Sequence, residues 1–305
     1  MIAQPIVRNT SDGNTRPPSL RTFLNLMTLE DLPPDSSAPS TREVEPLFEA
    51  ILQAGYEGVQ FTQAATPAQQ AACARLGLGK AGSGRVNQPA DAQPLAARFR
   101  DEGLACATLH VGWGMEDDDE ADRLIDAVLA ASARHDVPLY VETHRATIFE
   151  DLWRTVQFVR RFPELRFNGD FSHWYTGLEM VYGGFEKKFA FIRPVLDRVR
   201  FLHGRIGNPG SVQVDIGGGD SRAHPYVDHF RTLWTASMRG FLSSARAGDY
   251  LLFVPELLSP RIYYARVLKG GSAAVEESDR WEQSLVLRRI AEECFACACE
   301  ANHEQ

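Results

Sequence analysis

Short apolar or β-branched runs alternate with longer segments of helical period from about residue 20 onward. Eight runs have the length and residue types of strands: Thr22–Thr28, Gly58–Gln63, Leu76–Gly82, Ala105–Gly112, Pro138–His144, Leu165–Phe171, Val199–Arg205 and Tyr250–Leu257. The third run is rich in glycine, which disfavours strands. The regular spacing nevertheless predicts one strand in each repeat.

Helical segments fill the intervals between these strands. They are Arg42–Ala54, Pro67–Leu76, Ala90–Glu102, Glu120–His135, Phe149–Phe162, Lys187–Val199, Tyr226–Ala247 and Asp279–Glu300. Pro67 and Pro89 stand where helices begin, and Gly55 and Gly103 where helices end. A strand–helix repeat of eight units predicts an α/β fold, the (β/α)8 TIM barrel, whose functional site lies at the carboxyl ends of the strands.

A doubly wound open sheet is the competing architecture. It usually carries a glycine-rich phosphate loop after its first strand. Here the first predicted strand is followed by Leu29-Glu-Asp-Leu-Pro-Pro34, without that glycine pattern, which favours the barrel. We expect residues 1–19 to be a flexible N-terminal extension, residues 20–305 to be a single barrel domain, and residues 207–225 to be a long loop over the mouth of the seventh strand.

Composition and charge narrow the class of protein. The chain is 44% hydrophobic and has no apolar run long enough to cross a bilayer, and its start lacks the basic and apolar segments of a signal peptide. We therefore expect a cytoplasmic protein that binds no membrane. The net charge of −8 disfavours nucleic acid as a partner, because that affinity depends on Lys and Arg.

The five cysteines do not indicate a disulfide framework. Their number is odd, and Cys294, Cys297 and Cys299 crowd into one predicted helix without a second Cys/His pair nearby. We interpret these three as thiols of a helix rather than as metal ligands.

The carboxyl ends of the last four predicted strands carry side chains that bind metals. These are Glu142, Asp170, His203 and Glu256, on successive strands five to eight. Three carboxylates and an imidazole suit one divalent ion such as Mn²⁺, our first choice, or Mg²⁺, Co²⁺ or Zn²⁺. Without a cation, clustered buried carboxylates would repel one another and lose hydration, which favours a metal over four unrelated structural roles.

Further residues near the same strand ends are candidates for contacts with a ligand. His110 ends the fourth strand, and the alternative is a histidine of the core. Trp113 and Trp174 would offer apolar faces to a sugar, although a tryptophan near a loop often only packs. Alternation along a strand also places His144 on the face of Glu142, and Arg205 on the face of His203.

Four segments together resemble the xylose isomerase-like TIM barrel superfamily of sugar isomerases and epimerases. They are Val141-Glu-Thr-His144, Asp170-Phe-Ser-His173, His203-Gly-Arg205 and Pro255-Glu256. The resemblance is to the single-metal branch, which includes ketose 3-epimerases, hydroxypyruvate isomerase and inosose dehydratase. It covers about residues 20–300 and is most specific over 138–260.

The resemblance implies that Glu142, Asp170, His203 and Glu256 hold one metal, while His173 and Arg205 face a carbohydrate substrate. It also implies a homodimer or homotetramer. A metal-chelated carbonyl/hydroxyl pair would make the adjacent C–H acidic and would stabilise an enediolate. Glu142 and Glu256 would then carry the proton, giving epimerisation if they act on opposite faces and isomerisation otherwise.

Three other functions are compatible with parts of this pattern. One is dehydration or β-elimination of an oxidised sugar or inositol derivative. Another is a non-catalytic barrel that binds a metal or a sugar. A third is the three-zinc apurinic endonuclease of the same superfamily, which shares Asp170-x-x-His173. That enzyme needs an Asp-x-His after the seventh strand, where this chain has Asp215-Ile-Gly217, so we expect no DNA-repair function.

Overall fold

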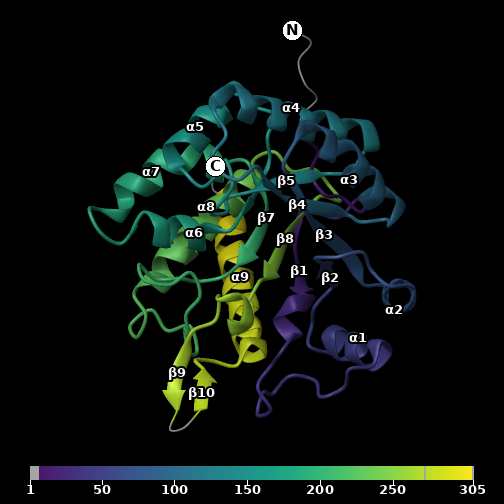
Figure 1. Cartoon of the computed structure of the whole chain (residues 1–305), viewed down its shortest axis with the longest axis vertical. Helices are drawn as coiled ribbons and strands as arrows, with labels where there is room; N and C mark the ends of the chain where they lie inside the picture. Colours follow the sequence, from purple (N-terminus) through teal and green to yellow (C-terminus); the bar gives the residue numbers. More distant parts are fainter. Residues whose placement is uncertain (1–6, 271–272, 304–305) are drawn as a thin grey trace.

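The computed structural model describes residues 7–270 and 273–303, and eight parallel strands close a barrel in chain order (Figure 1). The strands are β1 (Ser19–Asn25), β2 (Gly58–Phe61), β3 (Gly79–Val86), β4 (Cys106–Val111), β5 (Leu139–Glu142), β6 (Phe167–Gly169), β7 (Val199–Gly204) and β8 (Tyr250–Pro255). β1 pairs with β8, which closes the ring. The predicted (β/α)8 barrel is confirmed.

Helices follow the strands and surround the barrel (Figure 1). They are α1 (Val44–Gln53), α2 (Pro67–Leu76), α3 (Pro89–Asp101), α4 (Asp118–His135), α5 (Leu152–Arg161), α6 (Phe171–Gly177), α7 (Phe185–Leu196), α8 (Tyr226–Leu242) and α9 (Arg280–His303). The helix Pro67–Leu76 has the predicted bounds because Thr66 caps its start and Gly77 adopts the left-handed conformation after its end.

Two strands lie about three residues from their predicted positions. β1 ends at Asn25 because the Asn25 side chain accepts the Met27 backbone N–H and begins a short 3-10 helix over Leu26–Leu29. β3 begins only at Gly79, after the cap of α2, and its glycines serve packing. A Cβ built on Gly79 would lie 2.3 Å from Cζ of Phe23 in β1. Glycine is present here because the ring of Phe23 occupies that space.

One helix and one hairpin of the structure were not predicted. The helix α6 follows β6 immediately, since Asp170 ends the strand and its carboxylate accepts the Ser172 backbone N–H. β9 (Val267–Gly270) and β10 (Ala273–Glu276) pair antiparallel as a hairpin beside the barrel (Figure 1). The glycine pair at 270–271, between two short apolar runs, is a sequence signal for such a hairpin.

Residues 7–18 lie against the amino ends of the strands, unlike the flexible extension that we expected. The Val7 N–H donates to the Glu164 carbonyl, and the Tyr250 N–H donates to the Thr10 carbonyl at 2.9 Å. The hydroxyl groups of Thr10 and Tyr140 are 2.8 Å apart in the buried floor of the barrel. Residues 1–6, also part of that expected extension, lie outside the described residues.

Two features of the described chain bear on its class. In these residues no helix combines the length and apolar character that a bilayer span requires. All five cysteines are free thiols, with Cys73, Cys106 and Cys294 buried.

Candidate active site and metal centre

The four predicted ligands meet at the carboxyl ends of their strands. One donor atom from each of Glu142, Asp170, His203 and Glu256 lies within 4.8 Å of the donor atoms of the other three. Glu142, Asp170 and His203 are buried, whereas Glu256 is partly exposed and borders the open side. The sequence order of four adjacent strands thus becomes a compact cluster because parallel strands end at one rim.

The His203 ring is oriented by amides from two other strands. Its Nε2 is 3.1 Å from Oε1 of Gln60 in β2, and its backbone N–H donates to Oδ1 of Asn168 in β6. With its Nε2–H donated to Gln60, Nδ1 is the ring atom directed at the carboxylates, where it carries a proton in the metal-free protein and would offer its lone pair to a metal. Nδ1 lies 3.2 Å from Oε1 of Glu142 and 3.4 Å from Oε2 of Glu256. Metal-ligating histidines are commonly oriented in this way.

The carboxylates also have fixed partners. The Thr108 hydroxyl donates to Oε2 of Glu142 at 2.9 Å, and Asn168 in turn donates to Thr108. On the opposite side, Nδ2 of Asn25 donates to Oε1 of Glu256 at 3.1 Å. Such partners hold ligands at the correct angle for a metal.

Asn25, Gln60, Thr108 and Asn168 were not among the predicted site residues. Each is a buried polar side chain within an apolar strand. Thr108 stands two positions before His110, and Asn168 two positions before Asp170. Residues two apart on a strand share a face, so Thr108 and Asn168 face the barrel interior together with these candidates. That spacing is a signal by which the sequence could have revealed them.

Arg205 is buried and pairs with the ligands themselves. Its Nη2 contacts Oδ2 of Asp170 and lies 3.0 Å from Oε2 of Glu256, while its Nε donates to the Ser172 hydroxyl. One guanidinium therefore neutralises part of the charge of two carboxylates. The expected contact of Arg205 with substrate stays a prediction.

The electrostatics of the cluster favour ionised carboxylates. Burial by itself would raise the pKa of Asp170, but Arg205 and His173 lower that pKa well below its usual range. Burial likewise opposes ionisation of Glu142, yet His203 and His110 lower its pKa. For His203, burial disfavours the cation, but Glu256 and Glu142 raise the pKa to about 9. The three carboxylates thus bind positive charge, here a proton on His203 and the guanidinium of Arg205.

This donor set fits a divalent cation. Three carboxylates and one neutral imidazole are ligands typical of Mn²⁺, Mg²⁺, Co²⁺ and Zn²⁺ sites. Three buried polar atoms near the cluster, Nε2 of Gln60, Nδ1 of His173 and Nη1 of Arg205, have no hydrogen-bond partner in the described part of the chain. Buried polar atoms are normally paired, so these atoms have capacity for a polar ligand.

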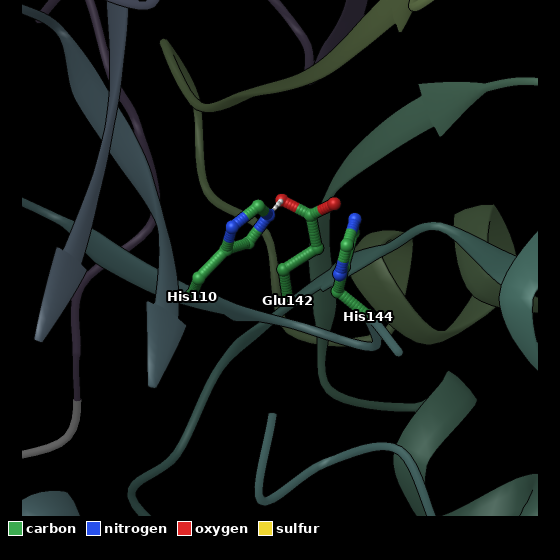
Figure 2. Close-up of side chains that lie close together, drawn as sticks. All are labelled: His110, Glu142 and His144. Atoms are coloured by element: carbon green, nitrogen blue, oxygen red, sulfur yellow. Dashed lines mark ion pairs between the residues drawn. The ribbon is translucent and has the colours of Figure 1, made fainter. Parts of the chain in front are cut away.

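Three histidines stand in a row beside the cluster. The ring centroids of His110 and His144 are 4.1 Å apart, and those of His144 and His173 are 3.9 Å apart. Nε2 of His110 lies 3.4 Å from Oε2 of Glu142, and Nε2 of His173 lies 3.4 Å from Oδ2 of Asp170. Figure 2 shows the Glu142 carboxylate between the imidazoles of His110 and His144.

The two predicted tryptophans occupy different environments. Trp113 is 49% exposed, and the Arg85 guanidinium lies 3.9 Å from the centre of its ring. Trp174 is 1% exposed and donates its indole N–H to the Phe149 carbonyl. Trp174 therefore packs in the core in this structure, whereas Trp113 presents an open surface. Their contacts with a sugar stay predictions.

A cavity of about 420 Å³ lies next to His173 and Trp174, with Arg145, Thr176 and Val212 among its lining residues. Val212 belongs to the loop 207–225 after β7, which was expected over this rim. The neighbouring Gln213 side chain bonds both the N–H and the carbonyl of Leu258, in the segment after β8. These two hydrogen bonds hold the loop against the segment that follows the eighth strand.

Comparisons with known proteins agree with the fold. No family model matches the chain, and neither does any curated protein. A xylose isomerase-like TIM barrel protein from Mycobacterium smegmatis, solved with magnesium, is similar at a TM-score of 0.54 and 14% identity over 92% of this chain and 98% of that chain. A xylose isomerase domain protein from Planctomyces limnophilus is similar at 0.51 and 14%, over 95% and 100% respectively. At these identities the likeness shows the fold alone, a TIM barrel.

Proposed function

We propose that the chain is a divalent-metal-dependent sugar isomerase or epimerase acting on a small carbohydrate. The observation that carries the proposal is the cluster of Glu142, Asp170, His203 and Glu256, with four donor atoms within 4.8 Å at the catalytic end of a barrel. The structural neighbour that holds magnesium has the same fold. Mn²⁺ is our first choice of ion because three of the four donors are carboxylates.

A bound divalent ion would polarise a vicinal carbonyl/hydroxyl pair and make the neighbouring C–H acidic. Glu142 and Glu256 would take that proton and return it, since each carboxylate has two oxygens and one can serve as a ligand while the other acts as base. They come from strands β5 and β8 and approach His203 Nδ1 from separate positions. Two separate carboxylates are what a two-base epimerisation would require.

Arg205 and His173 would bind substrate oxygens. Nη1 of Arg205 and Nδ1 of His173 are two of the three buried polar atoms beside the cluster that have no partner among the described residues. A guanidinium N–H donates to a hydroxyl or a phosphate oxygen, and an imidazole nitrogen can donate or accept. The hydroxyl groups of carbohydrates both donate and accept hydrogen bonds, so they could bond to either side chain.

The proposal is tested by proton exchange in deuterated water. Metal-loaded protein is incubated with ketoses, inositols and 3-oxo-sugars, and NMR follows the loss of each C–H signal. We expect one substrate class to exchange, and Glu142→Gln and Glu256→Gln to lower exchange by about 10²–10⁴-fold, the usual contribution of a general base. Glu282→Gln, an exposed substitution on α9, is the matched control.

The exchange experiment also separates the alternatives. Loss of exchange on one face of the substrate in each variant favours two-base epimerisation. Formation of an alkene or of a dehydrated ketone in place of exchange would identify β-elimination and contradict isomerisation. Wild-type exchange rates in both metal-loaded Glu→Gln variants would contradict the roles of these residues as bases.

A further inference from the structure

We infer that the protein holds a second divalent cation, bound by His110, Glu142 and His144 beside the four-residue centre. One donor atom from each of these residues lies within 4.8 Å of the other two. His110 belongs to β4, Glu142 ends β5, and His144 follows two residues later, beyond the end of that strand. Two imidazoles and one carboxylate form a ligand set of catalytic Zn²⁺ sites, which keep a further position open.

The Glu142 carboxylate faces both centres. Its Oε1 lies 3.2 Å from Nδ1 of His203, in the four-residue centre, and its Oε2 lies 3.4 Å from Nε2 of His110. Figure 2 shows the carboxylate flanked by His110 on one side and His144 on the other. A carboxylate with one oxygen toward each site is the usual bridge in two-metal centres, whose ions stand roughly 3.5–4 Å apart.

The His144 ring has the tautomer that a ligand needs. Its Nδ1 contacts the Arg145 carbonyl, and a carbonyl oxygen can only accept, so Nδ1 carries the hydrogen. Nε2 then has a free lone pair, and the Tyr264 hydroxyl lies 3.1 Å from it. A backbone carbonyl that fixes the second ring nitrogen is a common partner of metal-ligating histidine. Tyr264 would release Nε2 when a cation binds.

The second site is also open to solvent. His110 has 32% of its side chain exposed, whereas Glu142 and His144 are buried. An ion bound there would be reached from the mouth of the barrel and would keep room for an oxygen of water or substrate. Because it has two nitrogens and one carboxylate, this site should prefer Zn²⁺ or Co²⁺, whereas the three carboxylates of the first centre are better suited to Mn²⁺ or Mg²⁺.

The inference goes beyond the proposed function, which needs one cation, and rests on it only through the shared Glu142. If Glu142 bridges two ions, both of its oxygens are occupied. Glu256 would then be the single base, and the reaction would be an isomerisation rather than a two-base epimerisation.

The test counts metal ions in metal-free protein titrated with Co²⁺, using elemental analysis after dialysis and the visible spectrum of bound Co²⁺. We expect two equivalents in the wild type. His144→Gln and His110→Gln should each hold one, Asp170→Asn should hold one, and Asp170→Asn combined with His144→Gln should hold none. His135→Gln, at the C-terminal end of α4 and outside both clusters, should keep two. Circular dichroism verifies folding, and His110→Gln is informative even if the buried His144 variant is unstable.

The two proposals fail in different ways. A wild type that saturates at one equivalent, lost in Asp170→Asn and kept in His144→Gln, would overturn the second site and leave the proposed function standing. Two equivalents of metal retained in both His110→Gln and His144→Gln would also overturn the second site. A single equivalent that depends on His144 and is indifferent to Asp170 would contradict the four-residue centre instead.

Discussion

At the scale of single residues, the site depends on side chains that hydrogen-bond to the candidate ligands. Glu142 is held by Thr108, and Thr108 is held by Asn168, which also binds the backbone of His203. The cluster of candidate ligands was predictable because charged residues at strand ends are conspicuous in a sequence. Thr108 and Asn168 were not, because a neutral polar residue in a strand has many possible partners and only the closed barrel shows which one it has.

Thr108→Val should weaken metal binding by about 10–100-fold while the fold is retained, since valine keeps the shape of threonine but loses the hydrogen bond to Glu142. Calorimetric titration of metal-free protein with Mn²⁺ measures this. Thr232→Val, on the exposed side of α8, is the control and should bind as the wild type does. Equal affinities for both variants would show that Thr108 does not position the ligand.

The stability of the metal-free protein should depend on the protonation of His203. The folded-state pKa of about 9 lies above the ordinary value of 6.5, so the protonated imidazole stabilises the fold fully below pH 6.5, and this contribution is lost as the pH rises through 9. Its size is on the order of 3 kcal/mol. Glu142 stays ionised over this range because its pKa is lowered.

Urea unfolding in the presence of a chelator tests this dependence. The difference in unfolding free energy between wild type and His203→Gln should be large at pH 6 and should shrink toward pH 9.5. A constant difference across that range would mean that His203 is neutral in the folded metal-free protein.

At the scale of elements, the repeat of strand and helix was predictable and the exact register was not. All eight strands lie near their predicted segments, because a buried parallel strand is a short apolar run. The bounds of β1 and β3 differ from the predicted ones because helix caps and close packing decide where a strand begins and ends. The pattern of hydrophobic residues shows neither. In the sequence the glycines of β3 indicate against a strand. In the structure the ring of Phe23, from another strand, occupies the space that a side chain at Gly79 would need.

Gly79→Ala should lower the unfolding free energy by about 1–3 kcal/mol, the usual cost of overpacking a core, because the new Cβ would lie 2.3 Å from Cζ of Phe23. Gly218→Ala is the control, since a Cβ there has no atom within 4 Å in the described structure. Chemical denaturation measures both. If Gly79→Ala were as stable as the control, the packing of Phe23 would not explain the glycine.

At the scale of the whole molecule, the two ends of the barrel have separate tasks. In Figure 1 the arrowheads of β1, β7 and β8 point away from the end where the N-terminus lies. Residues 7–18 seal the amino ends of the strands, where Thr10 meets Tyr140, and the candidate metal centre lies at the carboxyl ends. Changes at the amino ends should therefore alter stability without altering the candidate metal centre.

A chain beginning at Ser19 should unfold several degrees below the full chain and still bind metal with the same affinity. The loss follows from removing buried Val7 and Thr10 and the backbone bonds of Tyr250 with this segment. Differential scanning calorimetry and metal titration provide the two readings. An unchanged melting temperature would contradict a structural role for the segment.

The most direct measurement of the central claim is an anomalous difference map from crystals of the protein grown with Mn²⁺. The account predicts a peak within about 2.0–2.2 Å of carboxylate oxygens of Glu142, Asp170 and Glu256 and of Nδ1 of His203, and its loss in Asp170→Asn crystals. No peak among these four residues at saturating Mn²⁺, or an undiminished peak in Asp170→Asn, would contradict it.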